Sequence, residues 1–248
     1  MSTGCVQLLA VSADSGQSEV VLPFRVAAAD LIIGASCAGC GRPAITLCAS
    51  CAGMLTPQPR VAWPRPTPQI LRQPSLIEPI AAGIHEGPLR AVLAQFKEEG
   101  QFGLLHILGH FLASSVCFAA PVNRPVVLVP IPSTRVTRMR RGQDTIGDLS
   151  RAAAKALRAI GIDCTVGSPL VHARRVADQS GLSARDRSIN MSDALRMRSV
   201  AGLEGRSIIV VDDILTTGAT VAEAVRVLTE AGFRPASIAV IAATTRHR

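Results

Sequence analysis

The sequence predicts an α/β fold in which a mostly parallel sheet is covered by helices on both faces. Short apolar segments rich in β-branched residues, such as 125–131, 206–211 and 236–242, alternate with amphipathic segments of helical length. Helices that connect apolar strands form right-handed crossovers, which make the strands parallel and bury both faces of the sheet. With 48% hydrophobic and 18% charged residues in 248 positions, the chain is long and apolar enough for one good-sized domain with a small satellite.

The elements of this fold follow one another from about residue 78 to the C-terminus. Expected strands, each a short apolar segment, are 79–84, 125–131, 163–166, 206–211 and 236–242. Expected helices, each with apolar residues at helical spacing, are 87–97, 102–118, 144–160 and 219–231. Gly100 separates the first two helices, and Gly232 ends the last one. Residues 182–190 are expected to be a short helix or a hood segment.

The first 77 residues follow a different pattern. Residues 1–30 are expected to be a poorly ordered N-terminal extension, and an upstream start codon chosen in error is the alternative for residues 1–24. Residues 31–55 contain a cysteine cluster. Residues 56–77 hold six prolines, which indicates a stiff, extended linker or an arm lying on the main domain. Residues 78–248 form that main domain.

The cysteine cluster consists of two C-x-x-C pairs separated by seven residues. Each pair can turn two thiolates toward one point, and two pairs complete a tetrahedral site for structural zinc. Gly41 permits the tight turn after the first pair. Four ligands leave no open coordination position, so we expect no catalysis by this metal. A disulfide framework, a redox C-x-x-C and merely buried thiols are the weaker alternatives. The predicted ligands are Cys37, Cys40, Cys48 and Cys51.

Residues 208–220 carry the strongest functional signal. Four β-branched apolar residues precede two adjacent carboxylates, Asp212 and Asp213, and a hydroxyl-rich turn around a glycine then opens a helix. Backbone N–H groups and the helix dipole at such a turn bind phosphate. Carboxylates instead accept hydrogen bonds from the vicinal hydroxyls of a ribose. The pattern therefore predicts a ribose site at the two aspartates and a 5′-phosphate site at Thr216, Thr217, Gly218, Ala219 and Thr220.

This segment resembles the phosphoribosyl-pyrophosphate (PRPP) loop of type I phosphoribosyltransferases. From about residue 31 to the C-terminus, the chain resembles one branch of them, the ComF family, which is associated with competence and DNA uptake in bacteria. The resemblance implies a type I phosphoribosyltransferase fold preceded by a small zinc module. That module could dock on the hood, pair two protomers in a homodimer, or contact nucleic acid.

By the same resemblance, the loop 129–134 holds the pyrophosphate of PRPP, with contacts from Pro130, Ser133 and Thr134. Four arginines follow within seven residues, and Arg141-Gly142 matches an R-G pair of the family. Guanidinium groups such as those of Arg140 and Arg141 neutralise a diphosphate leaving group. An ordinary strand exit and a solvated basic surface are the alternatives. A third segment resembles the ComF hood, assigned to acceptor recognition or loop closure through Arg175, Gln179, Arg187 and Asn190.

Composition excludes several classes of protein. Aromatic residues make up 3% of the chain, which argues against a base-stacking surface of the RRM or OB type. The net charge is +8, and 24 of the 26 basic residues are arginines, which bind phosphate in a bidentate manner. The uncharged stretch 103–123 contains two histidines and two serines, so a core helix fits better than a membrane span. Without a basic flank before Arg25, we expect no signal peptide and a cytoplasmic location.

The resemblance implies a phosphoribosyltransferase that binds PRPP with Mg²⁺ and releases pyrophosphate on transfer to an unknown nitrogenous acceptor. Asp212, Asp213 and Arg141 are the expected catalytic residues, because carboxylates stabilise the positive charge that develops at C1′. Mg²⁺ would neutralise and orient the diphosphate. No residue stands out as a general base, and the histidines are expected in core or surface roles. The rival reading is a non-catalytic PRPP sensor or an accessory protein that binds single-stranded DNA.

Overall fold

The structure, a computed structural model, describes residues 36–43, 46–99, 102–120, 124–133, 144–173 and 193–245. Six strands form the main sheet, namely β1 Arg60–Val61, β2 Glu78–Ile84, β3 Val126–Pro130, β4 Cys164–Val166, β7 Ser207–Leu215 and β8 Ser237–Ala243. Their order across the sheet is β1-β2-β8-β7-β3-β4, and every neighbouring pair is parallel except β1 with β2. The predicted α/β fold with a mostly parallel sheet is confirmed.

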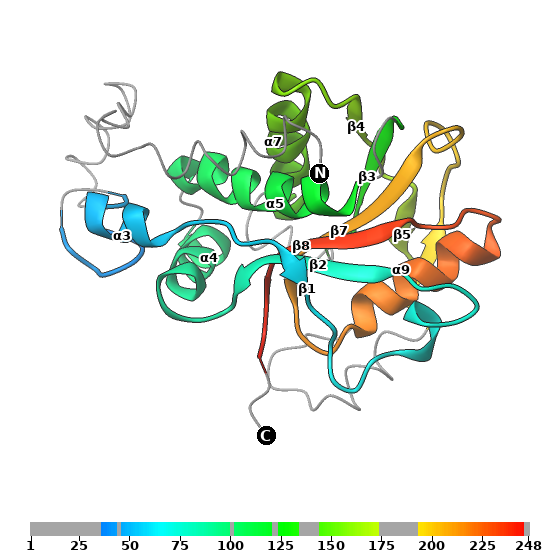
Figure 1. Cartoon of the computed structure of the whole chain (residues 1–248), viewed down its shortest axis with the longest axis horizontal. Coiled ribbons are helices and arrows are strands. Elements are labelled where there is room, and N and C mark those ends of the chain that lie inside the picture. Colours follow the sequence, from blue (N-terminus) through cyan, green and yellow to red (C-terminus); the bar gives the residue numbers. More distant parts are fainter. Residues whose placement is uncertain are drawn as a thin grey trace.

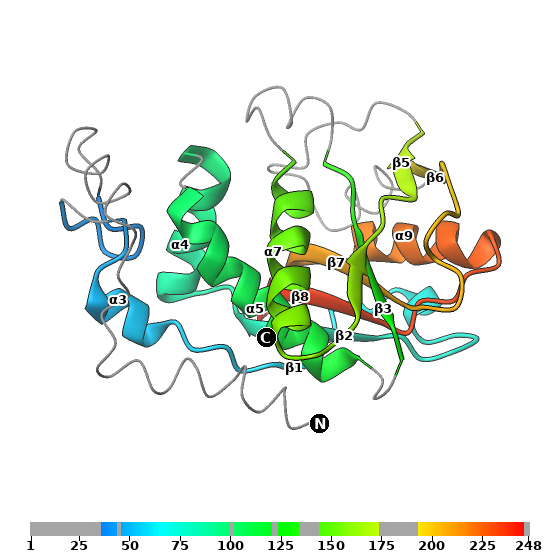
Figure 2. The ribbon, with the colours of Figure 1, turned by 90° about the horizontal axis from the view of Figure 1, so that it is seen from above.

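Helices cover both faces of this sheet (Figures 1 and 2). On one face, α4, α5 and α7 bury their apolar sides against the strands, and on the other face α9 and a short 3-10 helix, η1, do the same. A second 3-10 helix, η2, leads into α5. The bounds are α4 Gly87–Glu99, α5 Leu105–Ala119, α7 Thr145–Ala159, α9 Ala219–Glu230, η1 Gln69–Leu71 and η2 Phe102–Leu104. Among the residues that the structure describes, no helix is long and apolar enough to cross a membrane.

The four helices predicted from the hydrophobic pattern are therefore present, with ends that move by at most two residues, except that α5 begins three residues late because residues 102–104 form η2. The larger difference is at β7, which runs four residues beyond the predicted end at Val211. The ladder with β8 continues through Asp212, Ile214 and Leu215, and these backbone hydrogen bonds outweigh the low strand propensity of aspartate. The small second sheet of β5 Leu170–His172 and β6 Leu195–Met197 was not predicted from the sequence.

Residues 56–77 run along the edge of the main sheet. The N–H groups of Gln58 and Ala62 donate to the carbonyls of Ala82 and Pro79 at 2.7 and 2.8 Å. Leu71 in η1 is fully buried in the core between the sheet and α9. This proline-rich arm, as we call residues 56–77, is thus tied to the body of the protein along its length.

The cysteine cluster lies at one end of the molecule, where a short helix, α3 Ala49–Met54, stands beside α4 (Figures 1 and 2). Ala38, inside the first cysteine pair, and Leu55, after the second pair, belong to the core that α4, α5 and α7 form with the sheet. A side chain on Gly103 would meet the Thr46 side chain at 3.3 Å. The cluster therefore packs directly against the helical layer.

Candidate functional site

The two loops expected at the site leave adjacent strands at the same edge of the sheet. Pro130, the last residue of β3, is in register with Val211 of β7. The Ile131 N–H donates to the Val211 carbonyl at 3.0 Å. Past this point β7 continues along β8 alone, so Asp212 is its first residue beyond the end of β3. The sheet has a step at its carboxyl edge, bordered by loop 131–133 and by the turn that follows β7.

The turn between β7 and α9 has the features of an anion site. Gly218 has a φ of 75°, in the left-handed region that favours glycine. As the N-cap residue of α9 it supplies no capping side chain, and the first turn of the helix contains no acidic residue. The Thr217 hydroxyl accepts a hydrogen bond from the Ala219 N–H at 3.4 Å. The positive end of a 12-residue helix is therefore left for an anion to neutralise.

The proline-rich arm covers one side of this turn. A Cβ atom on Gly218 would lie 2.8 Å from Pro64 Cγ and 3.4 Å from Pro68 Cδ. Thr217 is only 8% exposed, and Gly218 is buried. The other predicted phosphate contacts, Thr216, Ala219 and Thr220, are partly exposed. The turn is therefore braced from the arm side and reachable through these three neighbours.

The two adjacent aspartates point to opposite faces of the sheet and have different partners. Alternation along β7 places Asp212 on the α9 side and Asp213 on the α4 side. Asp213 Oδ2 forms an ion pair with Lys97 Nζ at 2.6 Å. Asp212 Oδ1 accepts a hydrogen bond from the Asp213 N–H at 2.9 Å. Burial, and after it the charge of Asp213, raises the pKa of Asp212 to about 7 against the opposing effect of Lys97.

Sequence reasoning missed two residues at this edge. Lys97 comes from the last turns of α4, and its only sequence signal is that it is one of two lysines in an arginine-rich chain. His172, the last residue of β5, was expected in a core or surface role, but its Nε2 donates to the Pro132 carbonyl at 2.8 Å. Its Nδ1 is buried and has no hydrogen-bond partner among the described residues. His172 thus ties the small sheet to loop 131–133.

The other predicted site residues divide into two groups. Pro130 is buried within β3, and Ser133 is partly exposed at the end of the described loop. Seven predicted residues lie outside the described part of the chain: Thr134, Arg140, Arg141, Arg175, Gln179, Arg187 and Asn190.

The four cysteines predicted as metal ligands come together. Their Sγ atoms all lie within 4.8 Å of one another, and those of Cys40 and Cys48 are 3.8 Å apart. A tetrahedron with zinc–sulfur bonds of about 2.3 Å has edges of about 3.8 Å, so a zinc ion fits the cluster. None of the four forms a disulfide. Gly41 has a φ of 74°, which agrees with the predicted turn, and a side chain on Gly39 would collide with Cys51 Sγ.

The charges of the cluster also suit a cation. The Cys48 N–H donates to Cys37 Sγ at 3.3 Å. Burial opposes ionisation of Cys37, but this donor and two further N–H groups lower its pKa to about 6. Hydrogen bonding with Cys48, burial and the other thiols raise the pKa of Cys51 to about 12. Four thiolates this close repel one another unless a cation lies between them, so the donor set fits a divalent metal.

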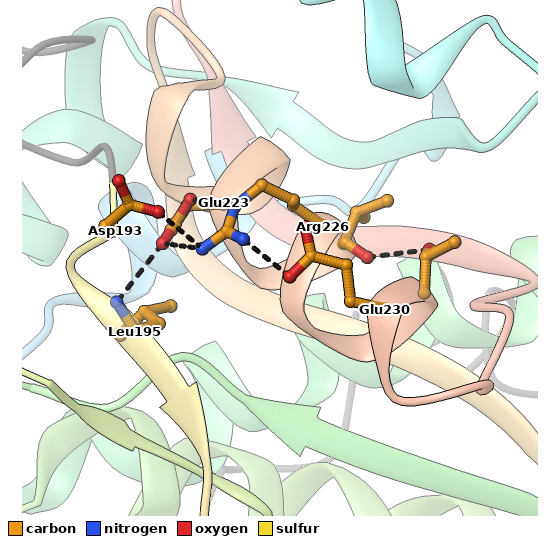
Figure 3. A network of polar contacts seen from close by, with 7 residues as sticks. Asp193, Leu195, Glu223, Arg226 and Glu230 are labelled. Carbon is orange, nitrogen blue, oxygen red and sulfur yellow. Dashed lines mark hydrogen bonds and ion pairs between the residues drawn. The ribbon is translucent and has the colours of Figure 1, made fainter.

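A second acidic cluster lies farther along α9 (Figure 3). The Arg226 guanidinium contacts Glu223 at 2.8 and 2.9 Å, Glu230 at 2.6 Å and Asp193 at 3.2 Å. Glu223 is 6% exposed and also accepts a hydrogen bond from the Leu195 N–H at 3.3 Å. The hydrogen bonds to Glu223 raise the pKa of Arg226, which stays charged. This cluster fastens the start of β6 to α9.

Comparison with protein families matches residues 123–248, about half of the chain, to the phosphoribosyl transferase domain. Among curated proteins, the chain is similar to "DNA utilization protein YhgH" of Escherichia coli strain K12. They are 30% identical over 149 residues, which cover 58% of this chain and 63% of the relative. The Salmonella typhi protein of the same name is 28% identical over 202 residues, which cover 79% of this chain and 83% of the relative. The match to the Escherichia coli protein thus spans less than two thirds of its length.

Solved structures include more distant similarities. One chain, described as "Analysis of an invariant aspartic acid in HPRTs-alanine mutant", is 15% identical, with a TM-score of 0.32 and coverage of 58% of this chain and 66% of that one. A hypoxanthine phosphoribosyl transferase of Trypanosoma cruzi is also 15% identical, with a TM-score of 0.32 and coverage of 60% and 67%.

Proposed function

The chain belongs to the phosphoribosyl transferase domain family, and from this membership we propose that it is a ComF-like phosphoribosyltransferase. It binds PRPP with Mg²⁺ and transfers the phosphoribosyl group to a nitrogen atom of an acceptor still to be found, with pyrophosphate as the leaving group. One observation carries the proposal: a helix N-terminus without a capping side chain and two carboxylates meet at one step of the sheet edge. The relatives named for DNA utilization support a role in DNA uptake or nucleotide metabolism.

In this proposal the turn between β7 and α9 holds the 5′-phosphate of PRPP. The N–H groups at the start of α9 and the hydroxyls of Thr216, Thr217 and Thr220 are donors of the right kind, and the dipole adds a favourable charge. The proline-rich arm keeps the turn in shape before the ligand arrives, because Pro64 and Pro68 lie against Gly218. A turn that is already formed costs little ordering free energy when it binds phosphate.

Asp212 is the first carboxylate to consider for the ribose hydroxyls. It lies at the step and has no ion-pair partner among the described residues, whereas Asp213 is paired with Lys97. The ionised form of Asp212 accepts hydrogen bonds from the sugar, and a Mg²⁺ ion bound near the ribose would lower the pKa of Asp212 and favour this form. The same carboxylates stabilise the positive charge that develops at C1′ as pyrophosphate departs. Asp213 can also accept a hydrogen bond from the ribose, either through Oδ1, the oxygen not paired with Lys97, or after its ion pair with Lys97 breaks.

The pyrophosphate side of the site belongs to loop 131–133 and the segment that follows it. Ser133, Thr134, Arg140 and Arg141 are the proposed contacts, Arg141 is proposed as catalytic, and His172 holds the loop from behind. A bound Mg²⁺ ion would neutralise and orient the diphosphate. We assign Arg175, Gln179, Arg187 and Asn190 to acceptor recognition, again as part of the proposal.

The cysteine cluster is proposed to hold one structural zinc ion through Cys37, Cys40, Cys48 and Cys51. A cytoplasmic location is part of the proposal, because reducing conditions keep all four thiolates free for the metal. Metal analysis of the purified protein should give about one zinc per chain for a four-cysteine site. A content far below that value would contradict the assignment.

Isothermal titration calorimetry with PRPP tests the proposed function. Wild-type protein should bind PRPP at pH 8 with Mg²⁺, and the double variant Asp212→Asn/Asp213→Asn should bind it at least about 100-fold more weakly, because two charged acceptors are lost. The matched control is Asp163→Asn/Glu204→Gln, which removes two exposed carboxylates that precede β4 and β7, at the amino edge of the sheet. Equal affinity of the wild type and the first double variant would refute the ribose assignment.

A second candidate function is a non-catalytic one, either as a PRPP sensor or as a protein that binds single-stranded DNA. It is favoured by the net charge of +8 and by the relatives named for DNA utilization. PRPP binding without pyrophosphate release, tested with a panel of bases and nucleotides, would favour the sensor. DNA retention measured at two salt concentrations would separate a specific site from general attraction by arginines.

A further inference from the structure

Lys97 occupies a position at the candidate site that no motif indicated. It lies near the C-terminal end of α4 and reaches across to the end of β7, 116 positions later in the chain. Its ammonium group is 2.6 Å from Asp213 Oδ2, and the two side chains are 22% and 13% exposed. An ion pair this close and this shielded is stronger than a surface pair in full solvent.

The charges around the two aspartates do not balance without Lys97. Asp212 and Asp213 are neighbours in sequence, and Lys97 is the cation that acts on both of them among the described residues. His85, the residue after β2, interacts electrostatically with Lys97 and Asp213. Burial, and after it the charges of Lys97 and Arg90, lowers the pKa of His85, so this histidine adds no charge at neutral pH. The cluster therefore depends on one ammonium group to offset two adjacent carboxylates.

We propose that Lys97 is a positioning residue of this site, whose ammonium group fixes the Asp213 carboxylate on the α4 side of the step and limits the negative charge that Asp212 experiences. This inference rests on the proposed function where it concerns PRPP. Its consequence for the free protein is independent of any ligand: Lys97 sets the pH above which Asp212 is ionised and able to accept hydrogen bonds from a sugar.

The sign of the effect follows from the charges. Burial and Asp213 already raise the pKa of Asp212 to about 7, and Lys97 works against them. Removing the ammonium group leaves Asp213 uncompensated, so the pKa of Asp212 must rise further. PRPP affinity should then increase with pH through a midpoint that lies higher in the variant than in the wild type. A residue with a merely structural role would weaken binding to the same extent at every pH.

The test is a pH titration of the aspartate carboxyl carbons by NMR on the ligand-free full chain. The Asp212 signal is assigned from the Asp212→Asn variant. In wild type its midpoint should lie near pH 7, and in Lys97→Met it should move up by about one pH unit. Lys97→Arg keeps the charge and should keep the wild-type midpoint. Lys155→Met, which changes the other lysine of the chain at an exposed position of α7, is the matched control and should also leave the midpoint unchanged.

An unchanged or lowered midpoint in Lys97→Met would overturn the proposal. If Lys97→Met does not fold, the titration uses Lys97→Gln instead, which removes the charge but keeps a hydrogen-bond donor for Asp213. If neither variant folds, Lys97 is a structural residue and the proposal is equally overturned. Calorimetry between pH 6 and 9 then measures the PRPP affinity of the wild type and of Lys97→Met. A wild type that binds no PRPP at any of these pH values would refute the proposed function, whereas the carbon titration would still decide the role of Lys97.

Discussion

Within the described residues, two acidic clusters each have one cation, and they are built differently. On α9, Arg226 contacts the carboxylates of Glu223, Glu230 and Asp193 at 2.6 to 3.2 Å, and the buried Glu223 also accepts a backbone hydrogen bond (Figure 3). At the step of the sheet, Lys97 contacts one carboxylate of two. Asp212 is left with the N–H of its neighbour and a raised pKa.

The difference separates a structural use of acidic residues from the functional use proposed for Asp212 and Asp213. Buried carboxylates that stabilise a fold have their hydrogen-bonding capacity filled by the protein, as Glu223 has. A carboxylate kept half-buried beside a like charge costs stability, and such groups are concentrated at binding and catalytic sites. The two ends of α9 repeat the contrast, because its N-terminus lacks a capping side chain while its later turns carry the filled cluster.

The substitution with the largest expected effect removes the cation of the acidic cluster around Arg226. Arg226→Met leaves Glu223 buried without its cation and should lower the free energy of unfolding by about 3 kcal/mol. Urea denaturation followed by circular dichroism measures the loss. Arg151→Met is the matched control, since it removes an i,i+3 pair with Asp148 that has the same spacing but is exposed, and should cost less than about 0.5 kcal/mol. Equal losses in the two variants would show that the α9 cluster is no more than a surface network.

A smaller loss of stability is expected when the glycines at the two ends of α9 are replaced by alanine, and the loss should differ between the two ends. Gly218 and Gly232 have φ values of 75° and 85°, so alanine is strained at either position. Only at Gly218 does the new Cβ also meet the proline-rich arm, 2.8 Å from Pro64 Cγ, whereas at Gly232 it meets no atom within 4 Å.

Gly232→Ala should therefore cost about 1 kcal/mol of unfolding free energy and Gly218→Ala about 2 kcal/mol. Thermal unfolding of both variants gives the stability difference, and PRPP calorimetry should show weaker binding for Gly218→Ala alone. Binding lost to the same extent in both would mean that the arm does not shape the turn.

The smallest effect concerns the pH dependence of stability. The pKa of Asp212 is raised from its ordinary value of 3.8 to about 7, so the folded protein binds more protons than the unfolded chain between these values. The contribution of Asp212 to stability is thus lost as pH rises from about 4 to about 7. A pKa change from 3.8 to about 7 corresponds to about 4 kcal/mol at most, but partial exposure, solvent screening and loss of the charge-assisted hydrogen bond from the Asp213 N–H all reduce that value in Asp212→Asn. Asp212→Asn should therefore be more stable than wild type by about 1 kcal/mol at pH 8, with no gain at pH 4.

Unfolding curves at several pH values check this prediction. If Asp212→Asn is less stable than wild type at pH 8, Asp212 is a structural acid like Glu223 and the contrast between the two clusters fails. A gain in stability together with a loss of PRPP binding is the expected trade-off for a site residue.

Local patterns in the sequence were enough to predict the four long helices and the five parallel strands, and the family resemblance added the expectation that the two loops share one site. A strand, a glycine turn and a helix are encoded within residues 207–230, and parallel strands bring their carboxyl ends to one edge. Lys97 and Arg226 were not predictable in this way. Their carboxylate partners Asp213 and Asp193 are defined by how α4 and β6 pack, and no short-range pattern reports that packing.

The contact between the proline-rich arm and the turn at Gly218 was not predictable for the same reason. Six prolines indicated a stiff segment, but neither their number nor their spacing shows which surface the segment covers. That Pro64 lies against Gly218 depends on the pairing of β1 with β2 and on the burial of Leu71 beside α9.

A crystal structure with PRPP and Mg²⁺ bound tests the central claim most directly, namely that the step after Val211 is a sugar-phosphate site. The predicted result has the 5′-phosphate on the N–H groups of residues 216–220 and a ribose hydroxyl within about 3 Å of Asp212. PRPP bound elsewhere, or seated at the turn with its ribose directed away from Asp212, would contradict the account.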